Sequence, residues 1–270
     1  MSDGGEDDAY LSPPVQRAAR LLRHIAEGDP VVNMAKSARE LGINRTTLLR
    51  LLHTLEAERL IERRGEDTPG WRIGFGLIGM AAQAFFSEDL VQVAVPVLTR
   101  LAEAVGLSAH LGVLDGREII YLVRRTPNHA FASNIRVGSR LAAHAANMGR
   151  MILAYLPPEK VTQLYQGVPM PAVTAHTAVT MAQLRTQLDK DRTAGLAWSD
   201  GAYEDRISSV AAVVLDASGG PVAAVNVSGL NSSFEGADRR ARIGQAVADA
   251  GREISRQLGW HDVSQFKVVA

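Results

Sequence analysis

Residues 33–60 read NMAKSARELGINRTTLLRLLHTLEAERL, two amphipathic segments on either side of Gly42. Asn33 can cap a first, short helix, and Gly42 can end it because glycine accepts the positive φ common at helix C-termini. Asn44 can cap a second helix, in which leucines recur at the spacing of a buried stripe: Leu48, Leu51, Leu52 and Leu55. The pattern predicts a helix-turn-helix.

The opposite face of the second helix carries hydroxyl, guanidinium and imidazole groups at the turns where a recognition helix meets base edges. We predict that Arg45, Thr46 and Thr47 contact bases and that Arg50 and the arginines of the following hairpin contact phosphates. The candidate DNA-binding residues are Asn44, Arg45, Thr46, Thr47, Leu49, Arg50, His53, Arg63 and Arg64. An ordinary helical hairpin has a similar pattern, so the neighbouring segments must decide.

Both neighbouring segments favour a DNA-binding domain. Upstream, Val15, Ala18, Leu22 and Ile25 predict an amphipathic helix that closes a three-helix core. Downstream, residues 60–74 read LIERRGEDTPGWRIG, which predicts a β-hairpin around a turn with glycine and proline. Three helices and a hairpin make a winged helix-turn-helix domain, which we assign to residues 14–74.

Length and composition limit what the rest of the chain can form. Its 270 residues and 46% hydrophobic content are enough for a second, larger core. Residues 15–72 hold 11 Lys and Arg against 8 Asp and Glu, a local charge of +3, so DNA affinity must depend on dimerisation, shape and a few arginines. There is no cysteine and no apolar run long enough for a membrane span or signal peptide, so we expect a cytoplasmic protein without disulfides.

The remaining segments suggest four further parts. Residues 1–13 are acidic and without periodicity, which favours a disordered arm, and residues 261–270 form a C-terminal tail. Residues 75–88 are assigned to a linker helix, because GFGLIGMAAQAFF is apolar on nearly every side. Such a helix must be buried, either in the core of the second domain or, as we prefer, against its copy in a dimer.

Residues 89–260 alternate between helical and strand patterns. An amphipathic helix with Pro96 ends at Gly106, and SAHLGVLD and EIIYLVRR then predict a strand pair around a Gly-Arg turn. We expect further helices at 142–156, 181–194 and 235–258, and further strands at 208–216 and 221–230. The prediction is an α+β fold in which helices flank an antiparallel sheet.

In order along the chain, several of these segments resemble the isocitrate lyase regulator (IclR) family of bacterial transcription factors. They are LGINRTTLLRLLHTLEAERLIE, GWRIGFGLIGMA, HLGVLDGREIIYL, RVGSRLAAHAANMGRMILAYLP and PVAAVNVSGL. The resemblance covers the chain from about Val15 to Gly259. It implies a winged helix-turn-helix that reads a palindromic operator as a dimer, often within a tetramer. It also implies a GAF/PAS-like C-terminal domain that binds a small effector.

The resemblance also implies where the effector binds, between the sheet and the start of the 142–156 helix, under a loop at AWSDG. The implied effector-binding residues are Ser133, Leu141, Asn147, Met148, Asp200, Ser209, Ala211, Asn226 and Ser228. Ser209 replaces the family's usual cysteine, and Asn147, Met148 and Arg150 replace its small residues and lysine. These departures disfavour glyoxylate or pyruvate. The resemblance implies an aromatic acid or derivative instead, because many members of the family control aromatic catabolism and Met148 and Leu141 can pack on a ring. Without the resemblance these would be ordinary sheet positions.

Two other classes of protein stay open. One is a hydrolase fused to a DNA-binding head, which would use Ser139 or Ser209 with His144 and Asp200. No GxSxG, HExxH or GKS/GKT motif occurs, and the seven histidines lack metal-ligand spacing, so we predict no enzymatic activity, cofactor or metal. The other is a purely architectural DNA-binding protein, which an effector-dependent change in DNA affinity would exclude.

Overall fold

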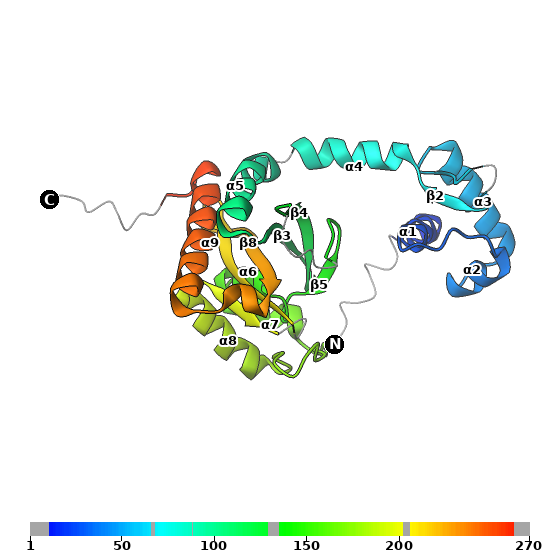
Figure 1. Cartoon of the computed structure of the whole chain (residues 1–270). Coiled ribbons are helices and arrows are strands. Elements are labelled where there is room, and N and C mark those ends of the chain that lie inside the picture. The colour runs from blue at the N-terminus through cyan, green and yellow to red at the C-terminus, as the bar shows by residue number, and fades with distance from the viewer. Residues whose placement is uncertain (1–10, 66–67, 88, 129–134, 202–205, 262–270) are drawn as a thin grey trace. The chain divides into compact units, whose positions relative to one another are not determined.

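The structure is a computed structural model that describes residues 11–65, 68–87, 89–128, 135–201 and 206–261. The chain divides into two units, Met1–Ser87 and Glu88–Ala270 (Figure 1). In the described residues, no helix is both long enough and apolar enough to cross a membrane.

Three helices build the first unit: α1 (Pro13–Ala26), α2 (Met34–Glu40) and α3 (Arg45–Ala57). Both predicted caps are present, because Asn33 accepts a hydrogen bond from the backbone N–H of Lys36 at 3.0 Å and Asn44 accepts one from Thr47 at 2.7 Å. Gly42 turns the chain between α2 and α3 with a φ of +64°. The three helices share one apolar core, which includes Leu21, Ile25, Leu48, Leu52 and Leu55.

A two-stranded hairpin follows the three helices. Strand β1 (Ile61–Arg63) pairs antiparallel with β2 (Trp71–Ile73), and the backbone N–H of Trp71 donates to the carbonyl of Pro30 at 2.8 Å. The predicted winged helix-turn-helix is therefore confirmed. The predicted inner stripe of α1 is shifted, since Val15 is 66% exposed and Leu21 is fully buried in its place.

Helix α4 (Phe75–Ser87) follows the hairpin and packs its first turn against β1. The fit is close, because a Cβ on Gly74 would lie 2.4 Å from the carbonyl oxygen of Arg59. Large apolar side chains of α4 nevertheless stay exposed: Phe75 at 67%, Ile78 at 49% and Met80 at 53%.

The second unit is built on a six-stranded antiparallel sheet with the order β5-β4-β3-β8-β7-β6. Its strands are β3 (Ser108–Asp115), β4 (Glu118–Arg125), β5 (Arg140–Ala142), β6 (Ala197–Asp200), β7 (Ile207–Leu215) and β8 (Pro221–Leu230). Adjacent strands are joined by tight turns between β3 and β4 and between β7 and β8, as predicted. The β3–β8 pairing joins these two hairpins into one sheet.

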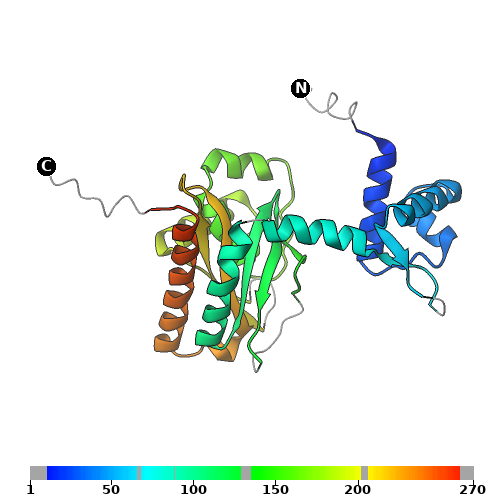
Figure 2. The same cartoon turned by 90° about the horizontal axis from the view of Figure 1, so that it is seen from above.

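Helices cover both faces of the sheet, which confirms the predicted α+β architecture. On one face, α5 (Asp89–Val105) packs on β3 and β4, and α9 (Ala237–Gln257) packs on β7 and β8 beside α5 (Figures 1 and 2). On the other face, α6 (Asn147–Tyr155) contacts β3, β4, β6, β7 and β8, and α8 (Met181–Ala194) packs on α6. Helix α7 (Pro158–Tyr165) and the short 3-10 helix η2 (Asn231–Phe234) complete the unit.

Three parts of the second unit differ from the sequence-based expectation. The helix expected at 142–156 begins only at Asn147, because Arg140–Ala142 pairs as strand β5 and residues 143–146 turn the chain. The segment AWSDG, expected as a loop, is largely strand β6, which pairs with β7 at the sheet edge. Helix α7 was not expected from the sequence; it begins at Pro158, where the fixed φ of proline suits the first helical turn.

Candidate nucleic-acid interface and small-molecule cavity

The solvent-facing side of α3 is the candidate nucleic-acid interface. Its exposed side chains follow helical spacing along one face: Arg45, Thr46, Leu49, Arg50 and His53. Thr47 is half-buried, and the Asn44 side chain is used as the N-cap of the helix. The cap fixes the first turn of α3, where backbone N–H groups and the helix dipole favour an anionic partner.

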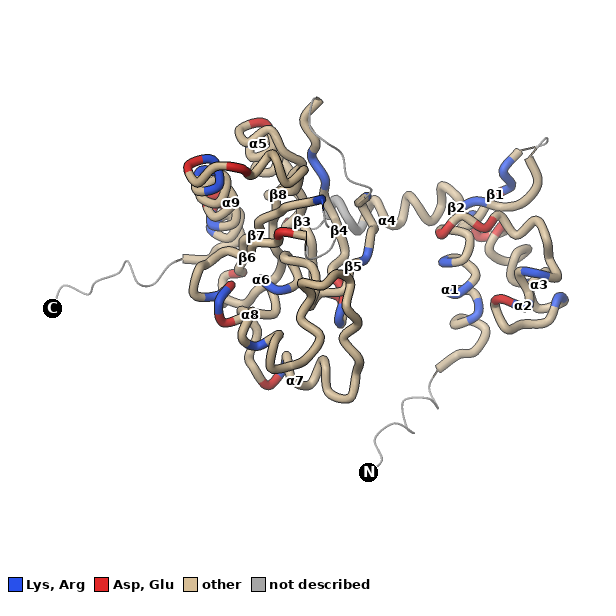
Figure 3. Tube along the Cα trace, turned by 60° about the horizontal axis from the view of Figure 1, so that its bottom comes forward, with Lys and Arg blue, Asp and Glu red and all other residues tan. Residues whose placement is uncertain are grey.

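The predicted cations of this face fall into two kinds. Arg45, Arg50 and Arg64 make no ion pair with any residue that the structure describes, so their charges remain available to an anionic partner. Arg63 differs, since its Nε lies 3.0 Å from Oε1 of Glu56 and its guanidinium lies 4.1 Å from the ring centre of Trp71. Arg63 therefore ties the hairpin to α3. Figure 3 shows basic positions on α3 and at the hairpin.

A small cavity of about 30 Å³ lies over the face of the sheet that α6 covers. Its apolar wall is formed by Tyr121, Ile135, Leu141, Ala146 and Ile207. Its polar wall carries amides and hydroxyls, from Asn147, Ser199, Ser209, Asn226 and Ser228. No lining residue is ionised, so any ligand held here meets neutral hydrogen-bonding groups opposite an apolar surface.

Sheet register explains the row of hydroxyls in the polar wall. Ser199 on β6 pairs with Ser209 on β7, and Ser209 pairs with Ser228 on β8. Residues directly opposite one another in antiparallel strands point to the same face. Three hydroxyls therefore stand side by side across three strands, under the first turn of α6.

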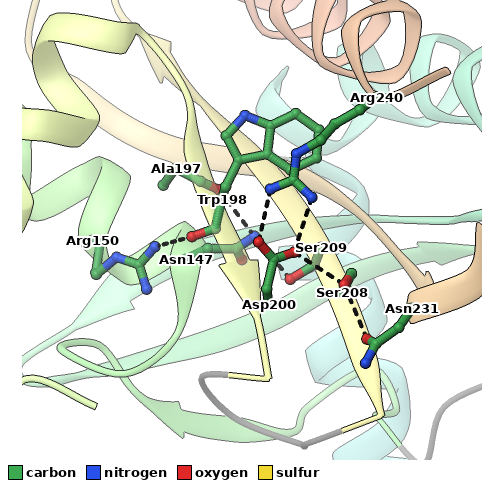
Figure 4. A network of polar contacts seen from close by, with 9 residues as sticks. All are labelled: Asn147, Arg150, Ala197, Trp198, Asp200, Ser208, Ser209, Asn231 and Arg240. Atoms are coloured by element: carbon green, nitrogen blue, oxygen red, sulfur yellow. Dashed lines mark hydrogen bonds and ion pairs between the residues drawn. The ribbon is translucent and has the colours of Figure 1, made fainter. Parts of the chain in front are cut away.

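Two asparagine side chains, Asn147 of α6 and Asn226 of β8, connect the cavity wall to the buried core by hydrogen bonds. Asn147 Nδ2 donates to Ser209 Oγ at 3.0 Å and to the carbonyl oxygen of Ala197 at 3.3 Å (Figure 4). Asn226 Nδ2 donates to Asn147 Oδ1 at 3.2 Å, and Asn226 Oδ1 lies 2.9 Å from Nδ1 of His110. A continuous chain of hydrogen bonds thus runs from His110 on β3 to Ser209 in the cavity.

His110 is fully buried on β3, directly opposite Asn226 of the cavity wall. Burial lowers the pKa of its imidazole to about 4, since desolvation outweighs the hydrogen bond to Asn226 and the charge of Arg124 also disfavours a second positive charge. The ring is therefore neutral at pH 7. It meets Tyr121 edge-on, with ring centres 5.4 Å apart.

A buried ion pair fixes the helix that carries Asn147. Arg150 Nε lies 2.8 Å from Asp191 Oδ2, with the two side chains 6% and 4% exposed. The same guanidinium donates to the carbonyls of Trp198, at 2.5 Å, and Ala145, at 3.5 Å. Arg150 thereby joins the first turn of α6 to α8 and β6, as Figure 4 shows for Trp198.

The structure brings five of the predicted effector residues together in the cavity wall: Leu141, Asn147, Ser209, Asn226 and Ser228. Three others do not line the cavity. Met148 is fully buried against Gly112 of β3, where an added Cβ would lie 2.9 Å from its Cε, and Ala211 is fully buried in the same core. Asp200 faces an outer cleft instead. Ser133 lies outside the described residues.

Asp200 is part of a separate polar network. Its carboxylate accepts hydrogen bonds from both terminal nitrogens of Arg240, at 3.1 and 2.8 Å, which lowers its pKa (Figure 4). Arg240 also stacks on Trp198, 3.9 Å from the ring centre, and Ser208 joins Asp200 to Asn231. These bonds hold α9 against β6, so the prediction that Asp200 contacts the effector is not supported by its position.

Five cavity residues were missed by the sequence-based prediction: Tyr121, Ile135, Ala146, Ser199 and Ile207. Ile207 could have been found, because it stands two positions before Ser209 on the same strand and so points to the same face. Tyr121 and Ser199 could not, since their approach depends on the order of the strands.

The residues considered for a hydrolase do not form a catalytic array. Ser139 accepts a hydrogen bond from the backbone of Arg136, and His144 Nε2 lies 3.0 Å from the carbonyl oxygen of Pro171. Ser209 accepts its bond from Asn147, and Asp200 pairs with Arg240. No histidine in the described residues makes a hydrogen bond to either serine.

One group of possible metal ligands exists in the described part of the chain, formed by His24, Asp29 and Glu40. The ammonium of Lys36 already lies 3.7 Å from Asp29 and 3.6 Å from Glu40. A cation is thus supplied by the protein itself, and we assign the group to an ion-pair cluster between α1 and α2.

Similarity to known proteins agrees with this geometry. Residues 14–65 match the model of the IclR helix-turn-helix domain, and residues 82–256 match the model described as bacterial transcriptional regulator IclR C-terminal. The chain is 28% identical to the HTH-type transcriptional regulator XynR of Escherichia coli, over 91% of this chain and 97% of that protein. It is also 28% identical to the E. coli transcriptional repressor IclR, over 90% and 89% of the two chains.

Solved structures share the fold. An IclR transcriptional regulator from Alicyclobacillus acidocaldarius matches with a TM-score of 0.81 and 24% identity, over 93% of this chain and 100% of that one. An IclR homologue from Microbacterium hydrocarbonoxydans, solved in complex with 4-hydroxybenzoate, matches with a TM-score of 0.79 and 24% identity, over 91% and 98% of the chains. The matched models cover most of the residues, and the chain belongs to the IclR family of DNA-binding bacterial transcriptional regulators.

Proposed function

We propose that this regulator binds a pseudo-palindromic operator as a dimer or tetramer through α3, and that a small organic effector in the cavity of the second unit changes its operator affinity. The preferred effector class is an aromatic acid or derivative. The observation that carries the proposal is the cavity itself, with a neutral polar wall opposite Tyr121, Leu141 and Ile207. The 4-hydroxybenzoate in the related structure from Microbacterium hydrocarbonoxydans supports the same class.

On the DNA side, the exposed face of α3 supplies both kinds of contact that an operator needs. Arg45 and Thr46 stand at the capped first turn, where side chains of a recognition helix reach base edges. Arg50 stands one turn further along with no ionic partner among the described residues, which suits a phosphate contact. Arg64 extends the basic surface onto the hairpin.

The small size of the cavity supports the proposal that effector binding changes the conformation of the second unit. About 30 Å³ holds only one or two water molecules, whereas pockets for organic ligands commonly enclose roughly 300–1,000 Å³. An aromatic acid can therefore enter only if the walls move apart. A ligand that binds one conformation better than another shifts the population toward it, so binding here must change the structure of the second unit.

The apolar surface of α4 supports the assembly part of the proposal. Phe75, Ile78 and Met80 are about half exposed or more, which a helix in water avoids unless a partner covers it. A second copy related by a two-fold axis would place two α3 helices for the half-sites of a pseudo-palindrome. Sedimentation of the wild type against Ile78→Arg measures whether the assembly depends on this surface.

Ligand binding is tested by differential scanning fluorimetry and calorimetry with a panel of aromatic acids, on the wild type and on Ser209→Val. We expect one or more acids to stabilise the wild type and to lose most of their effect on the variant. Ser218→Val, a hydroxyl in the exposed β7–β8 turn, is the matched control and should respond like the wild type. Equal responses of all three proteins would place the ligand elsewhere and refute the proposed site.

A further inference from the structure

The hydrogen bonds next to the cavity have a direction, and a backbone carbonyl fixes one end of it. The carbonyl oxygen of Ala197 can only accept, so the atom of Asn147 that faces it at 3.3 Å must be the amide nitrogen. The same nitrogen donates to Ser209 Oγ at 3.0 Å. Asn147 therefore turns its oxygen toward Asn226.

The orientation of Asn147 determines the orientation of Asn226 and the tautomer of His110. Asn147 Oδ1 needs a donor, so Asn226 presents its nitrogen at 3.2 Å and its own oxygen to His110. Because Asn226 Oδ1 can only accept, Nδ1 of His110 must carry the ring proton. Nε2 then holds a lone pair, and it has no hydrogen-bond partner among the described residues.

We infer that His110 is a positioning residue that holds the hydrogen-bonding polarity of the cavity together with the Ala197 carbonyl at the other end of the chain of hydrogen bonds, so that the site selects effectors presenting an acceptor oxygen, of a carboxylate or a carbonyl, to Ser209. The inference rests on the proposed function, since it takes this cavity as the effector site. His110 does not line the cavity and contacts the effector only through Asn226 and Asn147.

The polar wall is rich in donors as a result. Ser209 Oγ already accepts from Asn147, so its own proton is directed away from that amide. Ser199 and Ser228 form no hydrogen bond to another described side chain, and they stand beside Ser209 in the same row of the sheet. No carboxylate lines the cavity to receive a ligand's N–H or O–H. A ligand oxygen with lone pairs can thus accept the Ser209 proton, which the opposite orientation of Asn147 would have engaged, and Ser199 and Ser228 can donate beside it.

Burial explains why His110 can hold the amides of Asn226 and Asn147 in one orientation. His110 is fully buried and does not line the cavity, so water in the cavity does not take the place of its Nδ1 proton on the far side of Asn226. An unsatisfied buried group is costly, which keeps the amides from turning over while Nδ1 is protonated. The desolvated ring stays neutral, with a pKa of about 4, and neither Arg124 nor Tyr121 on β4 offers it a negative charge.

The first test reads the tautomer directly in the full-length protein. Nitrogen-15 NMR of histidine-labelled protein distinguishes a ring protonated at Nδ1 from one protonated at Nε2, and His110→Gln assigns the signal by its loss. We expect a neutral ring with its proton on Nδ1 at pH 7. A proton on Nε2, or a doubly protonated ring, would overturn the inference, whatever the cavity binds.

The second test compares two probes of similar size, the benzoate anion, which only accepts, and the benzamidinium cation, which only donates. Calorimetry should give benzoate the lower Kd in the wild type, and because each probe keeps its charge in every variant, the change in the Kd ratio between variants reports the direction of the amides. His110→Leu should reduce this ratio about tenfold, and His110→Gln, which keeps a donor, should restore most of it. Ser108→Ala removes another buried hydroxyl from the same face of β3 and should leave the ratio unchanged.

A preference for benzamidine, or a ratio that His110→Leu leaves unchanged, contradicts the inference. A ratio that falls equally in Ser108→Ala means that loosening of the sheet, not the direction of the amides, controls selectivity, and also contradicts it. If neither probe binds to the wild type, the aromatic effector of the proposed function is wrong, and the ring tautomer alone decides the inference. If His110→Leu fails to fold, the tautomer measured by NMR in the wild type decides the inference.

Discussion

Removing the carboxylate of Asp191 tests the buried ion pair that holds the start of α6. Arg150 and Asp191 are 6% and 4% exposed and lie 2.8 Å apart, and Asp191 Oδ1 accepts a further bond from Gln187 at 2.9 Å. Asp191→Ala leaves a buried guanidinium with only backbone carbonyls as partners. Breaking a buried pair in this way costs about 3–5 kcal/mol.

That free energy predicts a large change in melting temperature. For a unit of roughly this size, 1 kcal/mol shifts Tm by about 2–4 °C, so Asp191→Ala should lower the Tm of the second unit by roughly 6–20 °C. Differential scanning calorimetry is the assay, because it can separate the transitions of two units. Asp249→Ala is the matched control, since its pair with Arg252 is exposed and should contribute less than about 1 kcal/mol.

A double variant separates the charge from the packing. Arg150→Met with Asp191→Leu replaces the pair by apolar side chains, and such replacements are often neutral or stabilising, so most of the lost stability should return. Asp191→Ala with a Tm within about 2 °C of the Asp249→Ala control would refute our account of how α6 is held. A double variant less stable than Asp191→Ala would show that packing alone dominates there.

Three further results are expected. Asn44→Ala removes the N-cap of α3 and should cost the first unit about 1 kcal/mol, measured by its calorimetric transition, while Asn44→Ser should recover most of it. Gly149→Ala should sharply lower the Tm of the second unit, because the added Cβ would lie 2.3 Å from the carbonyl oxygen of Ala143, and an unchanged Tm would show that α6 can shift. His110 has a pKa of about 4 in the folded protein against 6.5 in the unfolded chain, so the unfolded chain binds this proton first as the pH falls. The free energy of unfolding should therefore not depend on His110 above about pH 6.5 and should fall by about 3 kcal/mol as the pH drops to 4. Urea titrations at several pH values should show a smaller loss in His110→Gln.

The first unit was largely predictable because its signals are local. Asn44 and Gly42 specify a cap and a turn within a few residues, and the leucine stripe of α3 is buried as expected. The helix Met181–Ala194 was likewise predicted with its bounds, since Thr180 and Gln183 form a capping box. Val15 was wrongly predicted to be buried. In α1 the stripe of apolar residues through Val15 and the one through Leu21 look equally apolar in the sequence, and only the packing of the three helices decides that Leu21 is buried.

The cavity was only partly predictable because it is made by strands far apart in the sequence. Ser199 and Ser209 become neighbours only when β6 pairs at the sheet edge, and AWSD is too short to predict that strand. Tyr121 reaches the site across β3 and β8. The role of His110 follows from the direction of two amides, which depends on the carbonyl of Ala197 and leaves no pattern in the sequence.

The most direct test of the central claim is fluorescence anisotropy of the protein on DNA from upstream of its own gene, across a salt series, with and without the aromatic acids. The account predicts selective, salt-sensitive binding that one of the acids shifts. Arg50→Ala should weaken binding to all sequences, whereas Arg45→Ala should relax discrimination by about 1–3 kcal/mol per contacted base pair. Binding without sequence selectivity, or selective binding that no cavity ligand changes, would contradict the account of an effector-responsive regulator.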